Sequence, residues 1–235
     1  MADGWRGEGA QHAGARPYQE DSWRLGRRSD GTLIAALADG MGGHAGGAVA
    51  SRLAVEAFLA AATADPSLEP ALEAANRAIG DGVRADAKFA GMGCTLVGVL
   101  LAGDRVDWIS VGDSPLWCLE AGDLARLNAD HSMAPQLAAM VERGMMTREE
   151  AEEHPARHRL RDAVMGEELQ LIDRGTRALG PGARLLLCSD GVQTLPESRL
   201  AELARSPVQA LVDAVIARAR PGQDNVTALL LERDT

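Results

Sequence analysis

The sequence has few aromatic residues and few cysteines, and it has almost no lysine. Only 3% of its 235 residues are aromatic although 46% are apolar, so the core must consist mainly of alanine, leucine and valine. A chain of this length fits one large domain or two small ones and can bury a sizeable core. The sequence shows no long linker, low-complexity tract or internal repeat, and we predict a single domain over residues 1–235.

Positive charge is also scarce. Lys88 is the only lysine, arginine supplies the other cations, and the formal net charge is −10. Non-specific binding to nucleic acid or to an anionic membrane surface requires a positive protein surface. The composition therefore predicts that neither nucleic acid nor a membrane is a partner.

Signals for export are absent from the sequence. Cys94, Cys118 and Cys188 form no CxxC pair and lie in apolar runs, which is typical of buried, reduced thiols. The segment "MADGWRGEGAQ" lacks the apolar stretch of a signal peptide. The longest apolar runs fall well short of the ~20 residues that span a bilayer. These features predict a soluble, cytoplasmic protein.

The distribution of apolar residues and turns predicts an α+β fold. Tight turns containing Gly and Asp at 29–31, 102–104 and 121–123 favour antiparallel neighbours, because a parallel pair needs a long crossover. Strands are expected at 5–11, 22–27, 32–38, 94–101, 105–111, 115–120, 168–174, 183–188 and 226–232. Helices are expected at 46–63, 68–88, 134–143, 147–154 and 207–219. Residues 131–167 contain two short polar helices, which we interpret as a flap outside the sheets.

A glycine-rich loop follows the apolar strand that ends at Ala38. Residues 40–45 fit the pattern G-x-G-x-x-G/A, so a Rossmann-type dinucleotide-binding enzyme is one interpretation. Asp39 would oppose a pyrophosphate at this position, and the rest of the chain has an antiparallel pattern. We therefore favour a second interpretation, in which the glycines clear space around Asp39 for a metal site.

Other acidic residues stand at the ends of predicted strands. Asp113 and Asp190 follow strands, and Asp224 precedes one. The exit of one antiparallel strand and the entry of its neighbour share an edge, so Asp39, Asp190 and Asp224 are expected to converge. Clustered carboxylates need cations, and hard divalent ions such as Mg²⁺ or Mn²⁺ prefer oxygen ligands. Upstream, Arg16 stands close to Glu20 and Asp21, and an arginine beside such a cluster can hold a phosphoryl group.

Seven motifs follow one another along the chain: "RPYQED" (16–21), "DGMGGHAGGAVAS" (39–51), "MGCTLVGVLL" (92–101), "VGDS" (111–114), "DHS" (130–132), "LLLCSDG" (185–191) and "DNVTALLL" (224–231). In this order and spacing they resemble the bacterial branch of the PP2C-like metal-dependent serine/threonine protein phosphatases. The resemblance covers roughly residues 5–232.

The resemblance implies an α/β sandwich of two packed antiparallel sheets flanked by helices, with two Mn²⁺ or Mg²⁺ ions at one edge. By motif position, Asp39, Asp190 and Asp224 match the ligands of one metal ion. Asp39, the carbonyl of Gly40, Glu20 and Asp21 match the surroundings of the second ion, with Asp21 acting through water. Asp113 and Asp190 match a third, weaker site, and Arg16 matches the arginine that binds phosphate.

The implied activity is hydrolysis of phosphoserine and phosphothreonine in proteins by a metal-activated water, reversing a bacterial serine/threonine kinase. The chain departs from the family at Met41, where eukaryotic members carry a histidine thought to protonate the leaving group, so we assign no general acid. Pro115 stands where arginine is frequent in the family. A catalytically silent pseudophosphatase that only binds partners is the remaining alternative.

Overall fold

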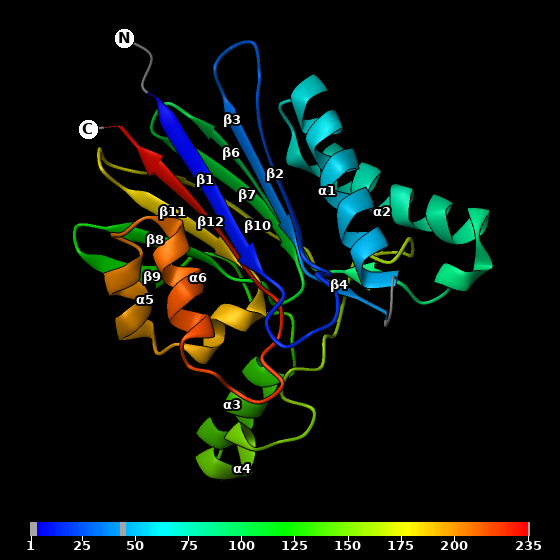
Figure 1. Cartoon of the computed structure of the whole chain (residues 1–235), viewed down its shortest axis with the longest axis vertical. Helices are drawn as coiled ribbons and strands as arrows, with labels where there is room; N and C mark the ends of the chain where they lie inside the picture. The colour runs from blue at the N-terminus through cyan, green and yellow to red at the C-terminus, as the bar shows by residue number, and fades with distance from the viewer. Residues whose placement is uncertain (1–3, 43–45, 235) are drawn as a thin grey trace.

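The computed structural model describes residues 4–42 and 46–234, and most of its strands form two five-stranded antiparallel sheets (Figure 1). The first sheet contains, in order, β1 (Trp5–His12), β12 (Val226–Arg233), β11 (Arg184–Cys188), β8 (Leu116–Glu120) and β9 (Asp123–Arg126). The second contains β10 (Asp173–Ala178), β7 (Arg105–Val111), β6 (Leu96–Ala102), β3 (Leu33–Ala38) and β2 (Ser22–Arg27). A short ladder pairs β4 (Gly40–Met41) with β5 (Gly93–Cys94).

Strand β3 shows how the sequence produces stacked layers. All six of its residues are buried. Leu33, Ala35 and Leu37 belong to the apolar cluster between the two sheets, whereas Ile34 and Ala36 pack toward the helices. Successive side chains of a strand point to opposite faces, so a strand that is apolar throughout must be covered on both sides.

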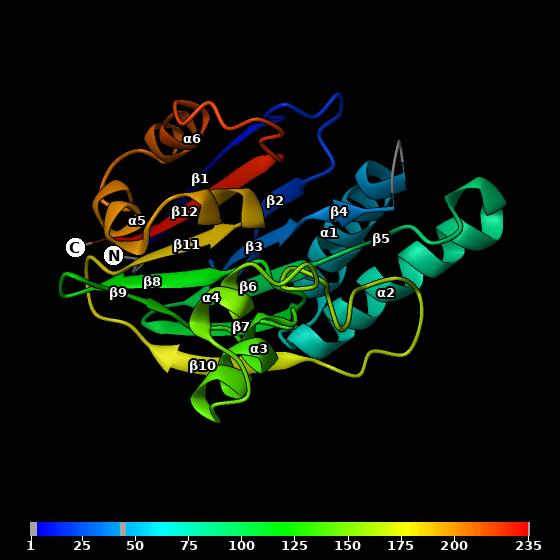
Figure 2. The same ribbon diagram turned by 90° about the horizontal axis from the view of Figure 1, so that it is seen from below.

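Two pairs of helices provide the outer layers, as Figure 2 shows. The helices α1 (Gly46–Ala64) and α2 (Leu68–Ala85) pack on the second sheet. The helices α5 (Glu197–Leu203) and α6 (Val208–Ile216) pack on the first. The predicted sandwich of two antiparallel sheets flanked by helices is thus confirmed.

Helix α1 departs from the expectation that no segment has the length and apolar character of a membrane span. Among the described residues it is the one helix long and apolar enough to cross a membrane by length and composition, although the sequence contains no unbroken apolar run of that size. In the fold, its buried face includes Ala50, Ala54 and Phe58, which pack in the apolar cluster on the second sheet. Core helices pass the same test of length and composition.

The flap leaves the sandwich after β9. Its helices α3 (Ala134–Glu142) and α4 (Arg148–Glu152) lie below the sheets in Figure 1. Helix α4 begins with the capping box expected from the sequence, in which the amide of Glu150 donates to the Thr147 hydroxyl at 3.2 Å. Isolated bridges join Ser132 to Leu160 and Cys94 to Val164, so both ends of the flap are held.

Several element boundaries differ from those expected. The sequence did not predict β4, β5, β9 or α5, nor the 3-10 helices Ala87–Phe89 and Asp190–Thr194. The strand expected at 168–174 is β10, which begins later, at Asp173. The cause is Asp162, whose carboxylate accepts hydrogen bonds at 2.6 Å from the amides of Gln170 and Leu171 and so holds this segment as a loop.

Candidate metal centre

Seven of the eight predicted site residues, Asp21 being the exception, line one cavity of about 760 Å³ at the edge of the sandwich. They are Arg16, Glu20, Asp39, Gly40, Asp113, Asp190 and Asp224, of which Gly40 contributes backbone only. Flap residues 158–163 form part of the opposite wall. Asp21 does not line the cavity and is only 4% exposed. The antiparallel edges therefore bring the strand-end carboxylates together.

Asp39 is held directly by the neighbouring strand segment. Its amide donates to the Thr95 hydroxyl at 3.0 Å, and its carbonyl accepts from the Thr95 amide at 2.8 Å. The Thr95 hydroxyl also contacts the Ser114 hydroxyl at 2.7 Å. Thr95 thus connects Asp39 to the loop that carries Asp113. The sequence did not assign a role to Thr95.

The glycines after Asp39 allow backbone segments to approach one another. A Cβ atom on Gly40 would lie 2.2 Å from the Gly47 carbonyl oxygen and 2.4 Å from that of Glu20. A Cβ on Gly47 would lie 2.6 Å from Oε1 of Glu20. Any larger residue would push Glu20 away from Asp39.

The dinucleotide interpretation of this loop is wrong. Strand β3 pairs antiparallel with β2 and with β6, whereas a Rossmann loop follows a strand of a parallel sheet. Residues 43–45 of the 40–45 loop, including His44, lie outside the described residues.

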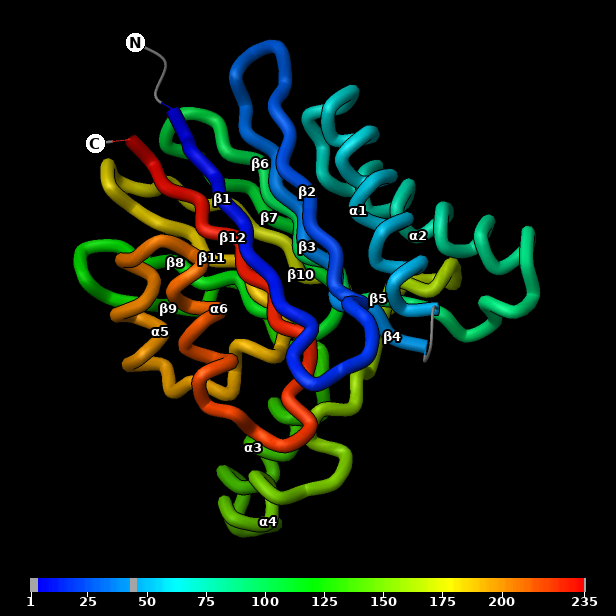
Figure 3. Tube along the Cα trace, viewed as in Figure 1, coloured from blue at the N-terminus to red at the C-terminus, as the bar shows by residue number. Residues whose placement is uncertain are grey.

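The position of Asp224 is set by its neighbour Asn225, whose side chain joins the loop after β1 to the segment before β12. The side chain of Asn225 donates to the carbonyls of Ala13 and Tyr18, both at 2.9 Å, and accepts from the Glu20 amide at 2.7 Å. Figure 3 shows the loop after β1 beside the segment that leads into β12. Asn225 stands within a quoted motif, but nothing local in the sequence indicates that it joins these loops.

Arg16 lies at the mouth of the cavity with its side chain half exposed. Its Nη2 atom forms an ion pair with Oδ2 of Asp224 at 2.7 Å. Among the described residues, the ion pairs include none for Asp39, Asp113 or Asp190. Negative charge in the cavity therefore exceeds positive charge.

Burial, together with this excess of negative charge, raises the pKa values of the carboxyl groups. Burial, then the charges of Asp21 and Asp190, raises the pKa of Asp39 well above its ordinary value. Burial and the charge of Asp190 raise the pKa of Asp113 to about 7, and burial raises that of Asp21 to about 6. The pKa of Asp190 is raised by burial and by the charge of Asp224. In each case burial, the larger cause, and the neighbouring carboxylates disfavour the ionised form.

The donor set fits a hard divalent cation. It consists of carboxylate oxygens and a backbone carbonyl, which Mg²⁺ and Mn²⁺ prefer, and bound cations would supply the missing positive charge. As the described side chains stand, no three acidic, histidine or cysteine side chains close around one point as a ready metal cage. The carboxylates instead face a shared cavity.

Comparisons with known proteins agree with this arrangement. Residues 8–230 match the family described as protein phosphatase 2C. The chain is 36% identical to the serine/threonine protein phosphatase PstP of Mycobacterium tuberculosis over 92% of its own length, and spans 42% of that relative. It is 32% identical to the serine/threonine phosphatase stp of Listeria monocytogenes, covering 93% of this chain and 92% of the relative.

Solved structures show the same fold. The catalytic domain of M. tuberculosis PstP in complex with two manganese ions superposes with a TM-score of 0.80 at 32% identity, covering 98% of this chain and 99% of that one. The two-sheet sandwich is thus the fold of a serine/threonine protein phosphatase catalytic domain that binds two manganese ions. The chain belongs to the protein phosphatase 2C family. The predicted family is confirmed, and the two manganese ions in the structure of that relative agree with the predicted Mn²⁺ or Mg²⁺.

Proposed function

We propose that this chain removes phosphate from phosphoserine and phosphothreonine in proteins, using the cavity around Asp39. One observation carries the proposal: strand-end carboxylates from both sheets and Arg16 line the same cavity of about 760 Å³. Their uncompensated charge matches divalent cations, and the arginine matches a phosphoryl group. Residues 1–235 are proposed to work as one domain, with 131–167 as its flap.

Each residue is proposed to have a separate role. Asp39, Asp190 and Asp224 would hold one cation. Asp39, the Gly40 carbonyl and Glu20 would hold the second, with Asp21 acting through a water molecule. Divalent cations in such a site activate water for attack and neutralise phosphoryl oxygens.

Asp113, together with Asp190, is proposed to hold a third, weaker cation. Asp113 is 6% exposed and follows β7, on the flap side of Asp39. A site with few protein carboxylates binds a hard cation weakly, because few charges offset the loss of hydration.

Arg16 is proposed to orient the phosphoryl group. Its guanidinium presents several donors in a planar fork that matches phosphate oxygens. The ion pair with Asp224 holds this fork at the cavity mouth. No covalent intermediate is needed: Cys94 and Cys188 are fully buried, and burial raises the pKa of each thiol, so neither is suited to act as a nucleophile.

A kinase that phosphorylates serine and threonine must supply the substrates, and we propose a cognate bacterial serine/threonine kinase in the cytoplasm as this partner. The buried, unpaired cysteines are consistent with a reducing compartment. Incubating the phosphorylated kinase with this protein and following loss of phosphate would test the pairing.

The central test is hydrolysis of p-nitrophenyl phosphate and of a phosphothreonine peptide with Mn²⁺, with and without a chelator. We expect turnover of both substrates that the chelator abolishes. A pseudophosphatase would bind Mn²⁺ without turnover, and either that result or chelator-insensitive activity would overturn the proposal. As a matched control, Asp107→Asn changes an aspartate that pairs with Arg105 away from the cavity and should leave activity intact.

A further inference from the structure

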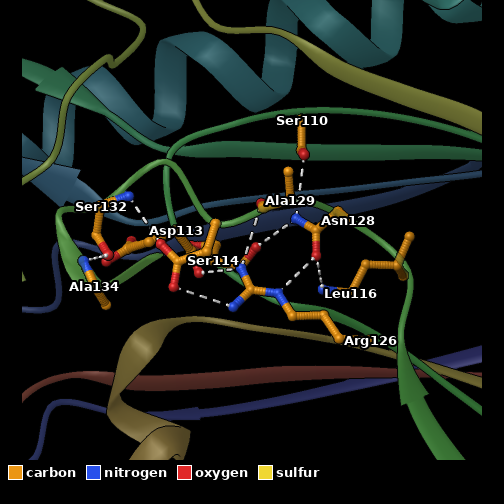
Figure 4. Close-up of polar contacts among 10 residues, drawn as sticks. Ser110, Asp113, Ser114, Leu116, Arg126, Asn128, Ala129, Ser132 and Ala134 are labelled. Atoms are coloured by element: carbon orange, nitrogen blue, oxygen red, sulfur yellow. Dashed lines mark hydrogen bonds and ion pairs between the residues drawn. The ribbon is translucent and has the colours of Figure 1, made fainter. Parts of the chain in front are cut away.

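Arg126, at the end of β9, makes a set of contacts that the sequence did not anticipate. It does not line the cavity, and its side chain is only 21% exposed. Its Nη2 atom donates to the carbonyl oxygen of Asp113 at 2.9 Å and its Nε atom to Oδ1 of Asn128 at 3.3 Å. Its Nη1 atom lies 3.4 Å from Oδ2 of Asp130. Figure 4 shows the guanidinium in the middle of this cluster.

These partners belong to two different loops. The first loop joins β7 to β8 and carries Asp113 into the cavity. The second joins β9 to the flap. Further hydrogen bonds cross between the loops: the His131 amide donates to the Gly112 carbonyl at 3.1 Å, and the Gly112 amide to Nδ1 of His131 at 3.2 Å. Asn128 adds a contact from its Nδ2 atom to the Ser114 carbonyl at 2.9 Å.

The second loop also sets the start of the flap. Oδ1 of Asp130 accepts a hydrogen bond from the Ser132 amide at 2.8 Å. The returning segment of the flap binds the same loop, because the Arg161 amide donates to the His131 carbonyl at 2.9 Å and the Met133 amide donates to the Arg159 carbonyl at 3.0 Å. Arg159 and Arg161 line the cavity opposite the carboxylates.

We propose that Arg126 is a positioning residue that fixes the Asp113 loop and the entrance of the flap relative to each other. The planar guanidinium donates hydrogen bonds to both loops at once, which the ammonium group of a lysine does not do in this geometry. The consequence is a mechanical link between the metal position at Asp113 and the cavity wall made by the flap. This inference rests on the metal assignment proposed above.

Replacing the guanidinium should loosen both loops together. In Arg126→Met, which keeps a long side chain, we expect the weakest Mn²⁺ equivalent to bind about tenfold less tightly, as is common when a partner of a metal ligand is lost. The tighter Mn²⁺ equivalents should remain. Hydrogen exchange at the amides of His131, Met133 and Arg161 should become faster even without metal.

Arg184→Met provides a matched control. Arg184 is similarly buried, with its side chain 23% exposed, and it binds a carboxylate and a carbonyl at the opposite end of the first sheet. This variant should lose thermal stability but keep the wild-type Mn²⁺ titration and wild-type exchange in the flap. If Arg126→Met changes only thermal stability, as Arg184→Met does, the proposal is wrong.

Arg126→Lys covers the case in which the methionine variant does not fold. Lysine retains the charge but reaches only one loop at a time. The affinity for the weakest Mn²⁺ equivalent and the rate of hydrogen exchange in the flap should therefore shift in the same direction as in Arg126→Met, by a smaller amount. Wild-type values for both in this variant would overturn the proposal. If the wild-type protein itself binds no Mn²⁺, the metal assignment fails, and the exchange measurement still tests the link between the loops.

Discussion

The two ends of the first sheet treat acidic residues in opposite ways. At the end far from the cavity, carboxylates pair with arginines: Glu232 with Arg184 at 2.6 Å and Asp234 with Arg6 at 3.0 Å. At the cavity end, Asp190 follows β11, is half-buried and has no ion pair among the described residues, and only Asp224 pairs with an arginine, Arg16. The difference teaches that acidic residues at the far end serve structure through their arginine partners, whereas the cavity end holds more carboxylates than its one ion pair neutralises.

The largest effect should come from Asp39, which belongs to both proposed metal shells. Asp39→Asn keeps the side-chain shape but removes its charge, so turnover should fall on the order of 10³-fold as several kcal/mol of transition-state stabilisation are lost. Steady-state kinetics with Mn²⁺ and circular dichroism would measure activity and fold. Glu232→Gln, at the far end, is the control and should keep turnover. Near-wild-type activity in a folded Asp39→Asn protein would rule out the metal centre.

Arg16 should have the next largest effect. Arg16→Ala should lower kcat/KM by an amount equivalent to about 2–4 kcal/mol, because a charged hydrogen-bond partner of the phosphoryl group is lost. Its removal also frees Asp224, so Mn²⁺ should bind no more weakly than in the wild type.

The matched control for this prediction is Arg6→Ala, which also removes an exposed arginine paired with an acid. It should leave kcat/KM unchanged. Equal kinetics for the Arg16 and Arg6 variants would show that Arg16 is only a surface residue.

The metal-free protein should become less stable as pH rises. The folded pKa values of Asp113, about 7, and Asp21, about 6, lie above the ordinary value of 3.8, so the folded state binds protons more tightly than the unfolded state. Stability should therefore decrease between about pH 4 and pH 7 by an amount on the order of a few kcal/mol. His131, whose pKa is lowered by burial, acts in the opposite sense.

Denaturant unfolding in a chelator at pH 5 and pH 8, with wild type and Asp113→Asn, measures this dependence. The unfolding free energy of the variant should fall less between pH 5 and pH 8 than that of the wild type, and Mn²⁺ should restore the stability of the wild type at pH 8. Identical pH profiles for the two proteins would contradict the prediction.

The smallest effect should appear at the far end of the sheet. Glu232→Gln removes a partly exposed ion pair with Arg184, and such pairs contribute about 0–1 kcal/mol. Thermal unfolding should shift slightly, and the pH dependence described above should persist. A loss of activity in this variant would contradict the assignment of a purely structural role to the acidic residues at the far end.

The sequence predicted the parts of the fold that depend on local patterns. The apolar run of β3 and the turn at 29–31 predicted the hairpin of β2 and β3. The strand-end positions of Asp39 and Asp190 predicted their convergence, because the ends of neighbouring antiparallel strands share an edge. Helix α5 was missed because it is short and follows Pro196 with no capping side chain.

What the sequence did not reveal are contacts between distant loops. Asn225, Thr95 and Arg126 hold site residues in place, but each does so through partners that no local spacing brings together. The late start of β10 has the same origin, since one carboxylate of the flap binds the backbone before it. Such residues become visible only when the chain is folded.

The pairing of β1 with β12 also sets an order in time. The register runs from Trp5 opposite Arg233 to His12 opposite Val226, and the pair of Arg16 and Asp224 joins residues 208 positions apart. During synthesis on a ribosome, β1 therefore cannot form its ladder until β12 has been synthesised. A nascent chain that has not yet exposed Asp224 cannot assemble the centre, so catalytic competence arrives in one step, after translation of the domain has finished.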